Sequence, residues 1–116
     1  MDTKLRKLTD YKYFSSKCNK VTICRASYFY TNPDIPGHQS RIHIEGVTIC
    51  DCQDTPDVEI GKKVARAKCD LQAYQEYRRR LKTAIENKID EIQDLKNELY
   101  KMKSCIAHQK EYLSQF

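Results

Sequence analysis

Apolar residues recur in a heptad pattern through the second half of the chain. With position a at Val64 and position d at Ile60, one register runs unbroken from residue 60 to residue 116. The a and d positions that are neither apolar nor aromatic are Arg78, Lys88 and Gln109. A stripe of this length must be buried against another helix. The pattern predicts a long helix over residues 57–116, which either folds back near residues 86–88 or pairs with a second chain. If unbroken, the part from residue 60 to residue 116 would be about 85 Å long.

The first half of the chain predicts two β-strands. Residues 20–31 and 41–52 are rich in β-branched and aromatic residues, and the Asn-Pro-Asp-Ile-Pro-Gly segment 32–37 between them is typical of a turn. In the second run the apolar alternation changes phase across Glu45-Gly46, which predicts a β-bulge there. Because an isolated hairpin is marginal in water, we expect it to pack on the helix or to pair with a strand from the N-terminal arm or from a second chain.

These elements predict an α+β fold. An antiparallel β-hairpin or small sheet, with a basic N-terminal arm, forms a head over residues 1–56. A long C-terminal α-helix or helical hairpin follows over 57–116, with coiled-coil-like packing in an oligomer. Residues 54–56, Asp-Thr-Pro, suit the start of this helix. Gly61, one turn in, predicts the close approach of another backbone or a ligand.

Composition favours a reduced, cytoplasmic protein. The chain of 116 residues opens without an apolar leader and contains no run of about 20 apolar residues, so we expect neither a signal peptide nor a membrane span. Six cysteines raise the possibility of a disulfide framework. Two of them, Cys69 and Cys105, lie in the predicted helix, and we interpret all six as reduced thiols.

The net charge of +5 is unevenly distributed. Residues 1–25 carry seven Lys or Arg against two acidic residues, and residues 60–82 carry eight against two. Residues 26–59 are instead acidic, with one Arg against six acidic residues. Basic charge gathered in the N-terminal arm and the start of the predicted helix favours a phosphate-bearing partner.

No catalytic motif is present in the sequence. It contains no Gly-x-Ser-x-Gly, no Gly-rich phosphate loop and no His-Glu-x-x-His. Cys18, Cys24, Cys50 and Cys52 could converge if their strands pair, but their spacings differ from those of zinc sites. We therefore expect no enzymatic activity, no metal and no cofactor, and we interpret these thiols as small apolar groups.

Arg78 occupies an a position of the stripe, close to Tyr74 and followed by Arg79 and Arg80. Burying a guanidinium is costly unless it is paired. In one interpretation its stem lies in the stripe while the charge reaches solvent and sets the register. In the other, the helices diverge here, so that these arginines bind phosphate and the tyrosine stacks on a base.

A second basic set lies near the predicted helix start, where the helix dipole and free backbone donors favour phosphate. Its members are Lys62, Lys63, Arg66 and Lys68. Such a run is also typical of a solvated helix face. The first strand adds groups suited to stacking and hydrogen bonding. The predicted ligand-binding residues are Arg25, Tyr28, Arg66, Tyr74, Arg78 and Arg79.

The order of elements resembles a known family. The predicted hairpin leads into a turn over residues 50–57, CDCQDTPD, and the helix opens with EIGKKVARA over residues 59–67. Across residues 40–80 this arrangement resembles small proteins of phages and prophages, in particular the first-described Thoeris anti-defence sponges. The resemblance implies a β-sheet head with long helices, assembly as a dimer or higher oligomer, and sequestration of a cyclic ADP-ribose-type signal without cleavage. The extra cysteines depart from that family and leave the ligand open.

The leading hypothesis is a non-enzymatic phage-type anti-defence protein that sequesters a small phosphate-bearing signalling nucleotide, cyclic ADP-ribose-like or a cyclic oligonucleotide. The expected partners are this nucleotide and further copies of the chain, in the host cytoplasm and without a membrane. One alternative is an anti-CRISPR protein or another phage inhibitor or regulator that binds a host protein or nucleic acid through its basic surface. A second alternative is a structural coiled-coil adaptor.

Overall fold

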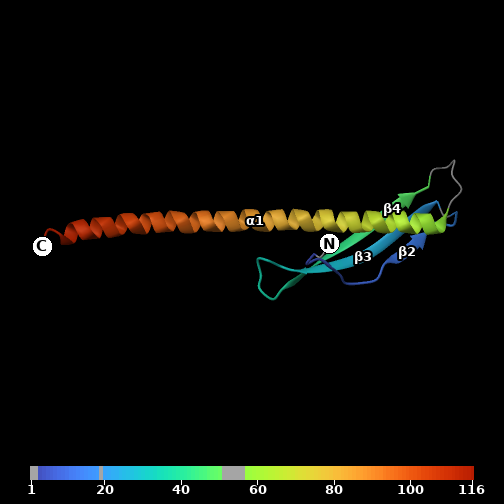
Figure 1. Cartoon of the computed structure of the whole chain (residues 1–116), viewed down its shortest axis with the longest axis horizontal. Helices are drawn as coiled ribbons and strands as arrows, with labels where there is room; N and C mark the ends of the chain where they lie inside the picture. Colours follow the sequence, from blue (N-terminus) through green and yellow to red (C-terminus); the bar gives the residue numbers. More distant parts are fainter. Residues whose placement is uncertain (1–2, 19, 51–56) are drawn as a thin grey trace. The chain divides into compact units, whose positions relative to one another are not determined.

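A small sheet and one long helix make up the described structure. The computed structural model describes residues 3–18, 20–50 and 57–116. Its elements are β1 (Arg6–Lys7), β2 (Lys12–Ser15), β3 (Val21–Thr31), β4 (Gln39–Ile49) and α1 (Val58–Leu113) (Figure 1). The chain divides into two compact units, Met1–Leu81 and Lys82–Phe116. The predicted α+β class, a sheet followed by a long C-terminal helix, is confirmed.

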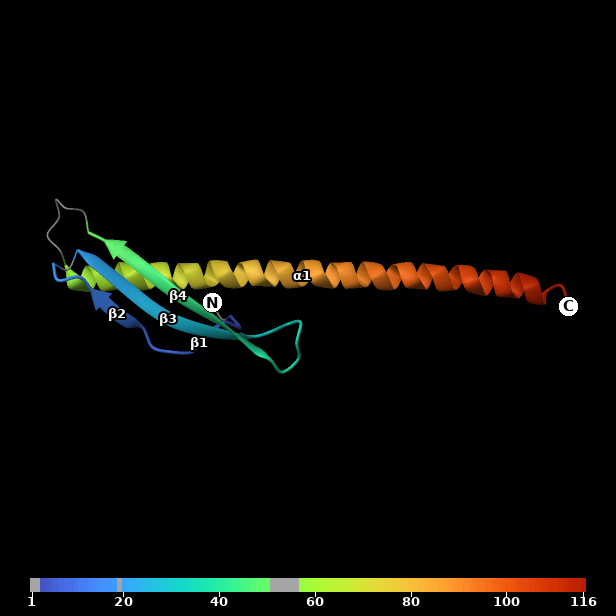
Figure 2. The same ribbon diagram turned by 180° about the vertical axis from the view of Figure 1, so that it is seen from behind.

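The sheet is antiparallel and centred on β3. β4 pairs with β3 along its whole length, from Val21 opposite Ile49 to Thr31 opposite Gln39. β1 and β2 pair with successive parts of the other edge of β3 (Figure 2). The N-terminal arm therefore supplies the additional strands that stabilise the predicted hairpin.

β4 keeps one register throughout, so the predicted β-bulge at Glu45-Gly46 is wrong. Both residues pair with consecutive residues of β3 without an insertion. Ile42 is buried on the face toward α1, and Ile44 lies partly buried on the same face. Val47 and Ile49 lie on the opposite face and are exposed. The change of apolar phase along this strand thus reflects two faces that both carry apolar side chains.

Two glycines allow α1 to approach the sheet closely. A Cβ at Gly46 would lie 2.3 Å from the backbone oxygen of Ala65 and 2.7 Å from the backbone nitrogen of Cys69. A Cβ at Gly61 would lie 2.7 Å from Oγ1 of Thr22. The close neighbour at Gly61 is the side chain of Thr22 and not another backbone, whereas Gly46 lies against the backbone of α1. The alternative of a ligand at Gly61 stays a prediction.

α1 begins at Val58 and is capped by Asp57. The Asp57 Oδ1 accepts hydrogen bonds from the backbone N–H groups of Glu59 at 3.0 Å and Ile60 at 3.3 Å. A carboxylate is favourable here because it also interacts with the positive end of the helix dipole. The predicted start residues 54–56 lie outside the described residues. α1 then continues through residues 86–88, so the alternative of a helical hairpin is wrong.

Small residues spaced four apart form the face of α1 that packs on the sheet. Ala65, Cys69 and Ala73 are fully buried, and Tyr77 continues the row. The sheet contributes Cys24, Ala26, Tyr28, Tyr30 and Ile42 to the same core. The absence of long side chains on this helix face lets the two backbones come close together, with β3 and β4 running beside the first turns of the helix (Figures 1 and 2).

The heptad stripe lies on a different face of α1 and is exposed. In the first unit Leu71 is 54% exposed and Tyr74 55% exposed. The sheet-facing residues Ala65, Cys69 and Ala73 occupy b, f and c positions of the same heptads, which point away from a and d. α1 therefore has two apolar faces, of which the sheet covers only one.

The second unit consists of the remaining part of α1 and the last residues of the chain. Its described residues are exposed with the exception of Ala84. The exposed side chains include the stripe residues Ile85, Ile92, Leu95, Leu99, Met102, Ile106 and Leu113. Within the described ranges, no helix combines the length and the apolarity that a membrane crossing requires.

Candidate functional site

The outer face of the sheet, defined as the face away from α1, carries ordered rows of side chains. Successive residues of a strand point to opposite faces. Because the even-numbered residues of β3 are buried toward α1, its odd-numbered residues lie on the outer face. The strand register then builds one cross-strand row from Lys12, Arg25 and Glu45. A second row, formed by Phe14, Ile23 and Val47, lies beside it.

A shallow cavity, widely open to solvent and with a volume of about 510 Å³, lies on this outer face. Small-molecule sites commonly measure about 300–1,000 Å³. The residues whose polar or aromatic groups line it are Thr9, Lys12, Phe14, Arg25, Ser27, His43 and Glu45. They come from β2, β3, β4 and the segment that joins β1 to β2. Its floor is therefore a hydrogen-bonded sheet, which holds the lining residues at fixed spacings.

Arg25 is held in place at this cavity by two neighbours. Its Nε donates a hydrogen bond to Oε1 of Glu45, the residue opposite it on β4. Its guanidinium carbon also lies 4.8 Å from the centroid of the Phe14 ring, a cation–π distance. Phe14 remains 46% exposed. The site thus presents a planar cation and an aromatic ring side by side.

The next row supplies groups that donate and accept hydrogen bonds. The Ser27 hydroxyl and Nδ1 of His43 are 2.7 Å apart and share a hydrogen bond. The backbone N–H of Ser27 donates to Oγ1 of Thr9 at 3.2 Å. Hydrolases use a serine beside a histidine as a nucleophile and base, with a third group that orients the ring. In the part of the chain that the structure describes, no such group bonds to Nε2 of His43.

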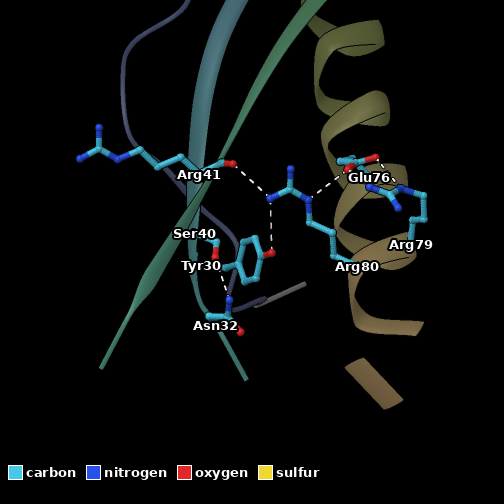
Figure 3. Close-up of polar contacts among 7 residues, drawn as sticks. All are labelled: Tyr30, Asn32, Ser40, Arg41, Glu76, Arg79 and Arg80. Atoms are coloured by element: carbon cyan, nitrogen blue, oxygen red, sulfur yellow. Dashed lines mark hydrogen bonds and ion pairs between the residues drawn. The ribbon is translucent and has the colours of Figure 1, made fainter. Parts of the chain in front are cut away.

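Positive charge predominates on the outer face. Arg6 and Arg41 lie opposite Phe29 on either side of β3, and so extend the cationic surface along the sheet beyond the cavity. Figure 3 shows the Arg41 guanidinium pointing away from α1, while its carbonyl oxygen accepts a hydrogen bond from Arg80 at 3.1 Å. Cations in rows around an aromatic ring favour an anionic ligand with a flat ring.

Of the six predicted ligand-binding residues, only Arg25 lines this cavity. Tyr28 is 5% exposed and belongs to the core between the sheet and α1. Its hydroxyl donates to Oδ1 of Asp70 at 2.9 Å, and burial is the main cause of the raised pKa of this phenol. Its ring is therefore covered by the helix.

Arg66 lies on the surface beside Tyr11, which is hydrogen-bonded to the same Asp70 carboxylate as Tyr28. Its guanidinium carbon is 4.5 Å from the centroid of the Tyr11 ring. The Tyr11 hydroxyl donates to Oδ1 of Asp70 at 2.6 Å, so this carboxylate oxygen accepts from two phenols. Burial and this hydrogen bond raise the pKa of Tyr11 to about 12. Arg66 thus packs over the edge of the core.

The other three predicted residues lie on α1 and away from the cavity. Tyr74 and Arg78 are exposed on the stripe face. Arg79 donates to Glu76, which also accepts from Nε of Arg80 at 3.0 Å (Figure 3). Hydrogen bonds from Arg79 and then Arg80 lower the pKa of Glu76 to about 2. The six residues do not converge on one site, and ligand binding by each of them stays a prediction.

Sequence reasoning did not assign Lys12, Phe14, Ser27 and His43 to a site. The alternation of β3 could have separated its outer residues from its buried ones. The contribution of β2 follows only from its pairing with β3, because residues 1–16 show no clear period. Within residues 3–18, 20–50 and 57–116, no cluster of three or more His, Cys, Asp or Glu side chains has a metal-binding arrangement.

Comparison with protein-family models, with curated proteins and with solved structures gave no match.

Proposed function

We propose that this protein is a non-enzymatic binder of a small phosphate-bearing nucleotide, held in the cavity on the outer face of the sheet. The observation that carries the proposal is the cavity of about 510 Å³, lined by two cations from adjacent strands and an exposed aromatic ring. Its volume suits a ligand of nucleotide size.

Each lining group has a role in this proposal. The guanidinium of Arg25 offers paired donors that match a phosphate, and Lys12 adds a second charge opposite it on β2. Phe14 stacks on the base, which is favourable for any nucleobase because each has a π-face. Ser27 and His43 bind hydroxyl groups or the base edge through hydrogen bonds.

The biological role that we propose is sequestration of a signalling nucleotide in the host cytoplasm, as part of a phage-type anti-defence activity. The support is the resemblance of residues 40–80 to anti-defence sponges, together with a site that offers binding groups. A cyclic ADP-ribose-like molecule or a cyclic oligonucleotide combines the phosphates and bases that such a site accommodates.

Calorimetric titration of the purified protein tests the proposal. The ligands are cyclic ADP-ribose isomers and cyclic di- and trinucleotides, and the expected result is saturable binding with the ligand recovered intact. A nucleotide that copurifies would appear as excess absorbance near 260 nm that is lost on denaturation and filtration. Absence of heat with all of these ligands would overturn the proposal, and turnover of a bound ligand would overturn its non-enzymatic part.

Three variants test the assignment of the cavity. Arg25→Ala removes a charge-assisted contact and is expected to weaken binding about tenfold or more. Glu45→Gln releases Arg25 from its internal partner and is expected to strengthen binding, whereas general damage to the sheet would weaken it. Arg78→Ala is the matched control, an exposed arginine on α1, and should leave affinity unchanged. Loss of binding with Arg78→Ala alone would place the site on α1.

Single-stranded nucleic acid is the second candidate ligand. The observation that favours it is the further row of Arg6, Phe29 and Arg41, which continues the cationic and aromatic surface past the cavity. Affinity for oligonucleotides should then rise with their length and fall steeply with salt, because each neutralised phosphate releases counterions. A single nucleotide that binds as tightly as an oligonucleotide would favour the small-ligand proposal.

A further inference from the structure

The exposed heptad stripe of the second unit is an apolar surface that a single chain leaves in water. Its a positions include Ile85, Ile92 and Ile106, and its d positions include Leu95 and Met102. Leu95 is 71% exposed, and the other four are between 44% and 58% exposed. Soluble proteins rarely leave so long a row of large apolar side chains exposed unless it is an interaction site.

We propose that a second copy of this chain covers the stripe in a parallel, in-register, two-stranded coiled coil that begins near Leu81. The partner is assigned from charges that flank the stripe. Lysines occupy e positions, namely Lys82, Lys96, Lys103 and Lys110. Glutamates occupy the g positions Glu91 and Glu98. Each of these residues lies in α1 and is exposed.

The placement of these charges fixes the orientation. In a parallel pair, each g residue faces the e residue five positions later on the other helix. Glu91 therefore meets Lys96 of the second copy, Glu98 meets Lys103, and symmetry doubles both attractive contacts. In an antiparallel pair e faces e and g faces g, so lysines would oppose lysines and glutamates would oppose glutamates. Only the parallel arrangement is complementary.

The residues of the stripe itself favour two strands. Isoleucine at most a positions with leucine or methionine at d is the pattern of parallel dimers.

Like charges limit the extent of the interface. In a parallel pair Arg78 would face Arg78 of the second copy at an a position, and residues 60–82 carry eight basic side chains against two acidic ones. This repulsion ends the coiled coil at about Leu81. Lys88 lies inside the interface at a d position, where it faces its own copy and lowers affinity while specifying the register.

Charge reversal followed by rescue tests the orientation. Sedimentation equilibrium of the full chain should give a dimer. The pair Glu91→Lys and Glu98→Lys should raise the dissociation constant about tenfold or more, since four attractive contacts become repulsive. Adding Lys96→Glu and Lys103→Glu should restore the original affinity. In an antiparallel dimer the first pair of changes would have no effect, which would overturn the proposal.

Disulfide cross-linking gives an independent readout that does not rest on charge. Leu95→Cys and Met102→Cys are made separately after Cys18, Cys50, Cys52 and Cys105 are replaced by serine. Each protein should form an interchain disulfide with itself on mild oxidation, because d faces d in register. Cross-links that appear only when the two proteins are mixed would indicate a shifted or antiparallel pair.

Lys88→Leu should strengthen the dimer, because it removes a like-charge contact from the interface. The dissociation constant should fall about tenfold or more. A chain that remains monomeric at all concentrations, or forms trimers, would overturn the proposal. The interface and the nucleotide site are independent, so failure of either leaves the other standing.

Discussion

At the scale of single residues, a few polar groups connect α1 to the sheet. Asp70 is the most important, because its Oδ1 accepts hydrogen bonds from the hydroxyls of Tyr11 and Tyr28. These phenols come from different parts of the sheet region, and both donate to this carboxylate. A buried donor that loses its acceptor costs more free energy than the bond itself contributes.

Asp70→Ala should lower the free energy of unfolding by about 1–3 kcal/mol, because it leaves two phenol hydroxyls without their acceptor. The measurement is urea unfolding followed by circular dichroism. Asp90→Ala, at an exposed position in the second unit, is the matched control and should change stability by less than about 0.5 kcal/mol. Equal effects of the two substitutions would contradict the role of Asp70.

Glu76 makes stability dependent on acid pH. Hydrogen bonds from Arg79 and Arg80 lower its pKa from 4.5 to about 2 in the folded protein, so the folded state favours the carboxylate. Its contribution is present at neutral pH and disappears as the pH falls from about 4.5 to about 2. Because both ion pairs of Glu76 lie near the surface, their contribution to the free energy of unfolding should stay below about 1 kcal/mol.

Glu76→Gln should therefore be slightly less stable than the natural protein at pH 7. The difference between the two proteins should shrink to zero as the pH is lowered through this window. Denaturant unfolding at a series of pH values gives the measurement. A difference that is independent of pH would show that packing, and not the ion pair, is responsible.

At the scale of elements, α1 has two faces with different partners. Small side chains on one face pack on the sheet, whereas Ile and Leu on the other form the exposed stripe. Close packing of a helix on a sheet depends on the volume of the contacting side chains. The sheet-facing row should therefore tolerate enlargement far less than neighbouring positions of the same helix.

Ala73→Leu should destabilise the first unit by about 1–3 kcal/mol, because Ala73 is fully buried against the sheet and extra methyl groups in a packed core force side chains and backbone to shift. Gln72→Leu adds a similar side chain at an adjacent exposed position. This control should leave stability within about 0.5 kcal/mol. Thermal unfolding monitored by circular dichroism compares the two.

Sequence reasoning identified the elements better than their contacts. The β-branched run ending at Thr31 predicted β3, and the heptads predicted α1, because both signals are strong and local. The sheet-facing row of α1 was missed since Ala65, Cys69 and Ala73 are small and weakly apolar beside the larger residues of the stripe. The cavity was missed because its lining depends on the register between β2, β3 and β4.

At the scale of the whole molecule, folding and association should be linked if the proposed coiled coil forms. A partner that binds only the folded helix stabilises it by mass action. The second unit has almost no buried residues of its own in a single chain. Its helical structure should therefore depend on the concentration of protein.

The melting temperature of the helical signal should rise as the protein concentration is increased. Circular dichroism at 222 nm over a wide range of dilution provides the measurement. The charge-reversed protein with Glu91→Lys and Glu98→Lys should melt at a lower temperature at each concentration. A melting temperature independent of concentration would contradict linked association.

Two thiols buried between α1 and the sheet offer a way to measure how often the helix separates from the sheet. Cys24 and Cys69 are both fully buried, and burial raises the pKa of Cys24 to about 11, so neither can react readily in the closed state. Cys18 and Cys105 are exposed and provide fast internal standards. Slow labelling of the buried pair by a thiol reagent, followed by mass spectrometry, should report the opening rate of this contact.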